Sequence, residues 1–174
     1  GRPILEIMRT PTFIVAALVA TIAQAVMNFL MTATPLAMRQ AEHMFGDTAL
    51  VIEWHSFAMF APGFVTGSLI KRFGTTPLIF TGLTIQLIAT GVALSGDGMA
   101  EFWTSLFLVG LGWNFAFVSA STLLTSVHSP PERAKVQGIN NFIIFGFVAF
   151  SSFMSGAIHH FFGWQWVNLV AIPL

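Results

Sequence analysis

Two ionisable side chains lie close together inside a long apolar segment. Glu53 and His55 flank Trp54, and the next charged residue along the chain is Lys71. An acid buried among apolar neighbours holds its proton more tightly and can exchange it between two conformations, which is the chemistry that a proton-coupled carrier needs. The alternative is an acid at the membrane interface, beside an interfacial tryptophan and within reach of headgroup water. Both interpretations stay open for Glu53 and His55 as proton-coupling candidates.

A second group of polar residues carries no charge. Gln24, Asn28 and Thr32 are four residues apart, so in a helix they form a polar stripe on one face. Asn114 lies in the middle of another apolar segment. Amide groups inside a bilayer either line a cavity or form hydrogen bonds between helices, which are worth about 0.6–2 kcal/mol. These four residues are candidates for lining a substrate cavity, with helix packing as the alternative.

Two further clusters follow in the last third of the chain. We interpret Gln137, Asn140 and Asn141 as gate or inter-helix residues rather than as a substrate site. The pair His159-His160 is a poor metal site, because adjacent side chains in a helix point about 100° apart and no carboxylate or cysteine is near in sequence. We expect these histidines to lie at a membrane interface and expect no bound metal.

Several kinds of chemistry find no support in the sequence. The chain has no cysteine, which excludes disulfides and thiol catalysis. Its formal net charge is zero, so nothing indicates nucleic-acid binding. No nucleophile–base pair, metal-ligand spacing or phosphate-binding loop is present. We therefore expect neither an enzyme nor a cofactor.

Composition indicates a protein embedded in a membrane. Of the 174 residues, 55% are hydrophobic and only 8% are charged, and the mean hydropathy is +0.79. A soluble domain carries roughly 25% charged residues. The apolar side chains must therefore face lipid as well as one another, and the length fits six crossings.

Charged residues mark the ends of the apolar segments. The last predicted segment has 11 residues, which at 1.5 Å per residue span about 16 Å of a hydrocarbon core about 30 Å thick. We therefore expect that helix to be incomplete, with truncation as the preferred explanation. The prediction is one transmembrane domain, residues 1–174, with helices over approximately 11–35, 52–70, 75–95, 102–126, 136–158 and 164–174.

The distribution of basic residues predicts the orientation of this bundle. With six crossings, six of the seven Lys and Arg residues fall on the same side as the N-terminus. Basic residues concentrate on the cytoplasmic side of membrane proteins, so we expect a cytoplasmic N-terminus. The six residues are Arg2, Arg9, Lys71, Arg72, Arg133 and Lys135, whereas Arg39 falls on the other side.

The loop after the second predicted helix carries a motif. Residues 67–74 read Gly-Ser-Leu-Ile-Lys-Arg-Phe-Gly, which resembles the signature loop Gly-x-Leu-x-Asp-Arg-x-Gly of the major facilitator superfamily. The matching positions are Gly67, Leu69, Arg72 and Gly74, while Lys71 stands where the full motif has an acid. Such degeneration is typical of the copy of the motif in the C-terminal half of these transporters. Residues 110–115, 132–138 and 155–164 resemble corresponding segments of bacterial members.

The resemblance covers essentially the whole chain and places it as helices seven to twelve of a twelve-helix carrier, with the last one truncated. It implies an all-α integral membrane fold, in which six transmembrane helices form two inverted three-helix repeats. It also implies the bacterial cytoplasmic membrane, alternating access and no cofactor. In that family the first and fourth helices of each half line the central cavity, the second and fifth contact the other half, and the third and sixth face lipid.

The leading functional prediction is half of a secondary active transporter that moves a small solute of unknown identity. Half a carrier cannot enclose a substrate site at the membrane midplane. Its expected partners are therefore membrane lipid and either an N-terminal six-helix half or another membrane subunit. The alternative is a carrier-derived, non-transporting structural subunit of a larger membrane complex.

Overall fold

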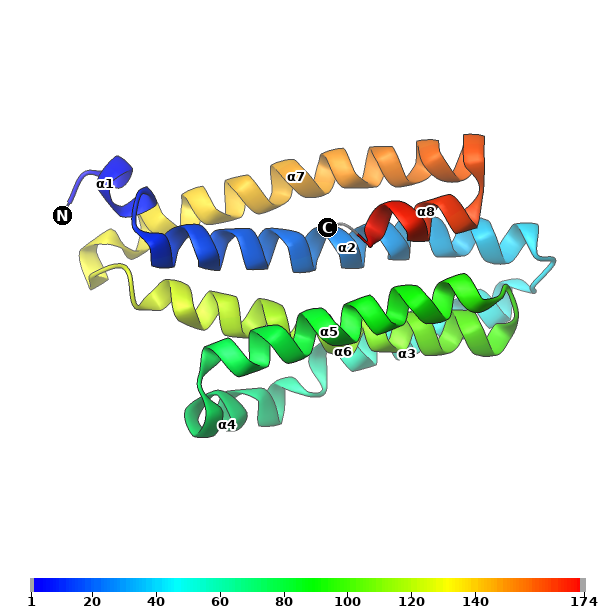
Figure 1. Cartoon of the computed structure of the whole chain (residues 1–174), viewed down its shortest axis with the longest axis horizontal. Helices are drawn as coiled ribbons and strands as arrows, with labels where there is room; N and C mark the ends of the chain where they lie inside the picture. Colours follow the sequence, from blue (N-terminus) through cyan, green and yellow to red (C-terminus); the bar gives the residue numbers. More distant parts are fainter. Residues whose placement is uncertain (1, 173–174) are drawn as a thin grey trace.

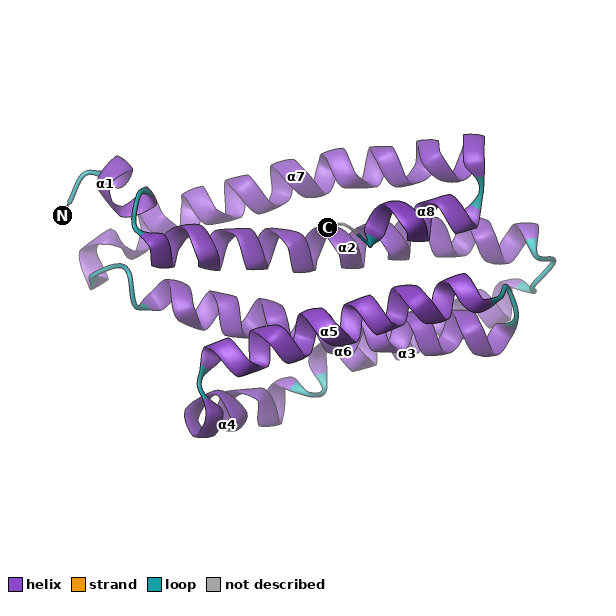
Figure 2. Ribbon diagram, in the orientation of Figure 1, coloured by secondary structure: helices purple, strands orange, loops and turns teal. Residues whose placement is uncertain are grey.

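The computed structural model describes residues 2–172, and these form helices joined by short turns (Figure 2). The long helices lie side by side along one direction (Figure 1). In chain order the elements are α1 (Ile4–Met8), α2 (Pro11–Gln40), α3 (Phe45–Phe60), α4 (Gly63–Phe73), α5 (Thr75–Ser95), α6 (Met99–Thr125), the 3₁₀ turn η1 (Pro130–Glu132), α7 (Arg133–Phe162) and α8 (Trp164–Ala171).

Four segments of the described chain are long and apolar enough to cross a membrane: α2, α5, α6, and η1 together with α7. The 30 residues of α2 extend about 45 Å, more than the hydrocarbon core of about 30 Å. Its start is well defined, because Pro11 occupies the first turn and the Thr10 hydroxyl accepts a hydrogen bond from the backbone N–H of Phe13. The chain is an all-α, multi-pass membrane protein.

The segment predicted as one helix over 52–70 is two helices. Helix α3 begins earlier, at Phe45, because Asp47 caps its first turn and its Oδ2 accepts a hydrogen bond from the Met44 N–H at 3.1 Å. Asp47, which falls between the predicted helices 11–35 and 52–70, is therefore part of a helix. Helix α3 ends at Phe60 and α4 starts at Gly63, since Pro62 has no N–H to donate to the preceding turn.

The ends of the chain differ from the prediction in smaller ways. The helix predicted over 136–158 runs from Arg133 to Phe162 and follows η1 directly. The last predicted helix, 164–174, is observed as Trp164–Ala171, and residues 173–174 lie outside the described part. The short helix α1 was not predicted from the sequence.

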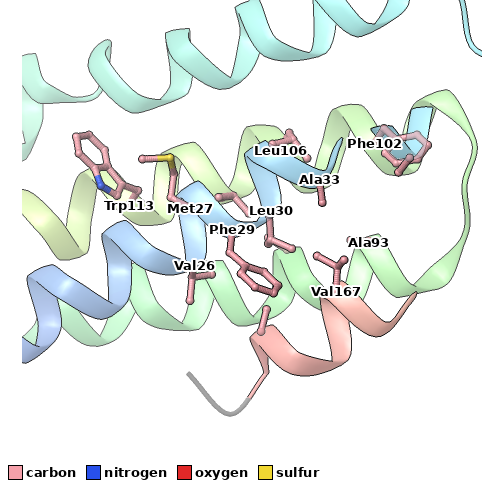
Figure 3. Close-up of a cluster of buried hydrophobic side chains, with 14 of the residues drawn as sticks. Val26, Met27, Phe29, Leu30, Ala33, Ala93, Phe102, Leu106, Trp113 and Val167 are labelled. Carbon is pink, nitrogen blue, oxygen red and sulfur yellow. The ribbon is translucent and has the colours of Figure 1, made fainter. Parts of the chain in front are cut away.

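The centre of the bundle is an apolar core around α2 (Figure 3). Leu30 and Ala33 of α2 belong to the same buried cluster as Leu106 of α6, Ala93 of α5 and Val167 of α8. The core therefore joins helices from the first and second halves of the chain.

Helices α5 and α6 approach closely because each presents a glycine to the other. A Cβ atom on Gly82 would lie 2.5 Å from the backbone nitrogen of Ala116, and one on Gly112 would lie 2.6 Å from the Gly82 carbonyl oxygen. Small residues of this kind let helix backbones pack tightly within a membrane. One face of α5 is thus buried against α6, and Gln86 donates a hydrogen bond to the Ala23 carbonyl of α2 at 3.1 Å.

The turn from α4 to α5 and the turn from α7 to α8 have the same backbone geometry. Gly74 has φ 88° and ψ 171°, and Gly163 has φ 88° and ψ 178°. A Cβ atom strains a backbone with positive φ, so both turns require glycine.

Candidate functional site

A groove of about 560 Å³ lies where the middle of α6 meets the break between α3 and α4 and the start of α7. We call it the α6 groove. None of the side chains that line it carries a formal charge. The lining residues are Met59, Phe60, Gly63, Trp113, Asn114, Phe117, Val118, Ser121, Thr122, Thr125 and Gln137.

Three aromatic rings form one wall of the groove. The Trp113 and Phe117 rings are stacked, with centroids 4.8 Å apart and planes 16° apart. Phe60 meets Trp113 edge-on, with centroids 6.1 Å apart. The indole Nε1 of Trp113 donates a hydrogen bond to Gln24 Oε1 at 2.6 Å, which fixes the ring against α2. Aromatic pairs prefer these stacked and edge-to-face arrangements.

Asn114 joins α6 to both sides of the break in the neighbouring helix. Its Nδ2 donates to the Met59 carbonyl at 2.7 Å, and its Oδ1 lies 2.5 Å from the Thr66 hydroxyl. Met59 lies in the last turn of α3, where helix carbonyls lack partners within the helix. The buried amide of Asn114 therefore stabilises the α3–α4 break at the edge of the groove.

The three residues of the polar stripe predicted on α2 have different surroundings. Asn28 Nδ2 donates to the hydroxyl of Ser152 on α7. The Thr32 hydroxyl donates to the Asn28 carbonyl of its own helix at 2.7 Å. Gln24 reaches the groove through Trp113. The structure thus brings Gln24 and Asn114 to the same site and directs Asn28 towards α7.

The three amides at the start of α7 also separate. Gln137 lines the α6 groove. Asn140 is buried, and its Oδ1 has no hydrogen-bond partner among the described residues. Asn141 is exposed. Among these three, Gln137 is the residue that a solute in the groove would meet.

Glu53 and His55 lie on different faces of α3. Glu53 is exposed and lines a second groove of about 850 Å³ between α2 and α3, together with Arg39. His55 is fully buried, and its Nδ1 lies 2.7 Å from the Leu106 carbonyl oxygen. Since a carbonyl only accepts, this Nδ1 carries the proton. Gly110 makes room for the contact, because a Cβ atom there would lie 2.6 Å from the His55 carbonyl oxygen.

The signature loop is exposed. Lys71 and Arg72 occupy the last turn of α4, where positive charge interacts favourably with the helix dipole. The Arg72 guanidinium lies 5.2 Å from the centre of the Phe73 ring. Gly74 makes the turn, whereas a Cβ atom on Gly67 would meet nothing within 4 Å. The glycines that permit close packing between helices are Gly82 of α5 and Gly110 and Gly112 of α6.

An ion pair at the end of the bundle was also missed. Arg2 contacts Glu132 at 3.0 Å and donates to the Val127 carbonyl at 2.8 Å. The Glu132 carboxylate, just before α7, accepts hydrogen bonds from the Arg2 guanidinium and from the Ser129 N–H. These contacts of Arg2 hold the N-terminal segment against the segment between α6 and α7.

The two histidines at the end of α7 differ in exposure. His159 is buried and His160 is exposed. Within residues 2–172, no group of three or more His, Cys, Asp or Glu side chains is arranged to hold a metal ion.

Comparison with known proteins identifies the family. The family model described as Major Facilitator Superfamily matches residues 12–174. The riboflavin transporter RfnT of Brucella anthropi is 43% identical over 174 residues, covering 100% of this chain and 44% of that protein. The uncharacterized transporter YdeG of Bacillus subtilis is 38% identical over 133 residues, or 75% of this chain and 31% of that protein.

A more distant relative, the drug efflux pump JefA of Mycobacterium tuberculosis, is 30% identical over 106 residues, covering 59% of this chain and 20% of the pump. The chain therefore spans less than half the length of the curated relatives it matches. A six-helix bundle, half of the family fold, agrees with these lengths and with the helices described above. The chain belongs to the major facilitator superfamily.

Proposed function

We propose that this chain is one half of a secondary active transporter that moves a small solute by alternating access. The observation that carries the proposal is the α6 groove, an open, uncharged hollow to which α3, α4, α6 and α7 all contribute. A second six-helix half facing this groove would enclose it near the membrane midplane, as the repeat architecture of such carriers requires.

Two features support the C-terminal half of the carrier and a cytoplasmic N-terminus. Lys71 replaces the acid of the signature loop, as in the degenerate second copy of that motif. The exposed Lys71 and Arg72 lie at the α4–α5 turn, which is at the same end of the bundle as the N-terminus (Figure 1). Basic loops stay in the cytoplasm, so we assign this end to the cytoplasmic face of a bacterial inner membrane.

Riboflavin is the first solute to test. The Brucella anthropi relative that matches the whole chain at 43% identity is named a riboflavin transporter. We propose that the carrier containing this chain moves riboflavin or a compound of similar size.

The test is uptake of radiolabelled riboflavin by cells that lack their own riboflavin transport and express the carrier with both six-helix halves. We expect uptake well above that of cells with an empty vector. Cells that insert the protein stably in a complex with other membrane proteins, yet take up none of a panel of small solutes, would support the alternative of a structural subunit.

A further inference from the structure

We propose that the α6 groove binds a flat, uncharged aromatic ring against Phe60 and Phe117, with Trp113 as the positioning residue for both. This inference rests on the proposed transport function and names the substrate class of the same groove. The first argument is the accessibility of the rings. Phe60 is 66% exposed and Phe117 is half-buried, while Trp113 behind them is only 9% exposed.

The aromatic wall is held in place before any solute arrives. Trp113 contacts both phenylalanines, and its own indole is fixed by the hydrogen bond to Gln24. A preorganised site loses less side-chain freedom on binding, which improves affinity. Gln24 thus acts on the solute through Trp113 rather than by direct contact.

The absence of charge defines the solute further. No charged side chain lines the groove, so a charged group on the ring or on its substituent would leave water without meeting a counter-charge in the groove, at a large cost in free energy. A neutral ring avoids this cost and gains stacking on the aromatic wall.

Beyond Phe117 the lining of the groove includes polar side chains. Ser121 follows one helical turn later on α6, and Gln137 of α7 lies at the same end of the groove. Neither side chain forms a hydrogen bond within the described part of the chain. A neutral substituent with hydroxyl groups, attached to the ring, would find its partners there. The groove therefore fits a solute with a flat ring at one end and an uncharged polar chain at the other.

Helix α6 supplies a matched control for this wall. Trp103 and Phe107 are also stacked at a spacing of four residues, with centroids 5.2 Å apart and planes 10° apart. Phe107 is half-buried like Phe117, but neither Trp103 nor Phe107 lines the α6 groove. On α4, Phe64 is 93% exposed and serves as the control for Phe60.

The experiment measures binding to the purified carrier, with both six-helix halves, in lipid nanodiscs. The probes are riboflavin, lumichrome (the ring without the polyol chain), ribitol (the chain without the ring) and the charged flavin mononucleotide. We expect riboflavin to bind most tightly, lumichrome to compete with it, and ribitol and flavin mononucleotide to compete at least tenfold more weakly than lumichrome.

Phe117→Leu and Phe60→Leu should each raise the Kd for riboflavin and lumichrome about tenfold, since each removes one aromatic side chain on which the ring stacks. Phe107→Leu and Phe64→Leu should leave both values within about twofold of the wild type. Gln24→Leu should weaken binding about threefold and shift the tryptophan fluorescence, whereas the same change in a Trp113→Phe background should add no shift.

Three outcomes overturn this inference. Folded Phe60→Leu and Phe117→Leu variants that bind riboflavin as the wild type does would exclude this wall as the ring site. A wild-type carrier that transports another solute but binds neither riboflavin nor lumichrome would overturn the proposal of a ring-binding groove but not the proposed transport function. A wild-type carrier that transports no solute at all would overturn both proposals.

Discussion

Helix α7 contacts α2 through serine hydroxyls, whereas α3 and α4 contact α6 through a histidine, an asparagine and a glycine. On α7, Ser151 and Ser155 donate to the carbonyls of Ala25 and Phe29. On the other side of the bundle, His55 bonds a carbonyl of α6 and Asn114 bonds a carbonyl of α3. In both places polar side chains of one helix bind the backbone of its neighbour.

The two interfaces differ in whether their helices are continuous and in the shape of the surface beside them. Helices α2 and α7 each run for 30 residues, with Pro35 inside α2, and the small serines of α7 join it to the backbone of α2. The partner of α6 is broken at Ala61-Pro62, and the break leaves the α6 groove beside it. We infer that the α2–α7 interface acts as a uniform support, whereas the α3–α6 interface carries the site.

The largest expected effect tests how closely α3 and α6 approach. In Gly110→Val the new Cβ atom would lie 2.6 Å from the backbone oxygen of His55 and 3.2 Å from the Ala58 Cβ. Moving helix backbone away from the new side chain costs much free energy. We therefore expect a loss of about 3 kcal/mol in the free energy of unfolding, measured by detergent-induced denaturation of the purified carrier.

The control for this substitution is Gly146→Val on α7, where a Cβ atom meets nothing within 4 Å. It should change the unfolding free energy by less than about 0.5 kcal/mol. Equal losses at the two sites would contradict the close approach at α3–α6.

The second prediction concerns the break itself. Asn114→Leu removes the hydrogen bonds to Met59 and Thr66 and leaves the Met59 carbonyl without its partner. We expect a loss of about 2 kcal/mol in the same assay. Asn141→Leu, at an exposed position on α7, should be almost neutral. An Asn114→Leu variant as stable as the wild type would show that the amide does not stabilise the break.

The α2–α7 interface should be less sensitive. Replacing both Ser151 and Ser155 with alanine removes two inter-helix hydrogen bonds and should cost about 1 kcal/mol in total. Ser56→Ala is the control, because that hydroxyl bonds the Ile52 carbonyl of its own helix. A double variant less stable than Asn114→Leu would reverse the ranking of the two interfaces.

The smallest effect on stability is expected in the middle of α3. Glu53 is exposed at the groove between α2 and α3, so Glu53→Gln should change the unfolding free energy by less than about 0.5 kcal/mol. If Glu53 couples proton movement to transport, this variant loses pH-driven uptake but retains exchange of solute across the membrane. Glu42→Gln, at another exposed acid, should keep both activities. Unchanged pH dependence in Glu53→Gln would end the proton-coupling hypothesis.

The membrane helices and the family could be predicted from the sequence. Stretches without charge mark the apolar segments, and the loop at residues 67–74 indicates the family; the all-helical structure and the match to the family model confirm both. The break at Pro62 was not predicted, because proline is tolerated in membrane helices when neighbours satisfy the freed backbone groups. Asn114 is that neighbour, and it lies about fifty residues further along the chain.

Individual polar residues of the site could be predicted from the sequence, but their arrangement in space could not. Gln24 and Asn114 were candidates from their residue types, yet only the fold shows that Trp113 links Gln24 to the groove. Aromatic residues are so common in this chain that their sequence positions do not distinguish a binding wall from lipid-facing surface. The functional roles of all these residues stay predictions.

The two glycine turns have a consequence for how the molecule is oriented. One turn joins α4 to α5 and the other joins α7 to α8, with nearly the same φ and ψ at Gly74 and Gly163, and the two turns lie at opposite ends of the bundle (Figure 1). The chain thus turns with the same glycine geometry at the two ends of the bundle, as in a module used twice in opposite directions. Lysine and arginine precede one turn and two histidines precede the other, so in the orientation proposed above the two turns differ in the charges beside them and not in backbone geometry.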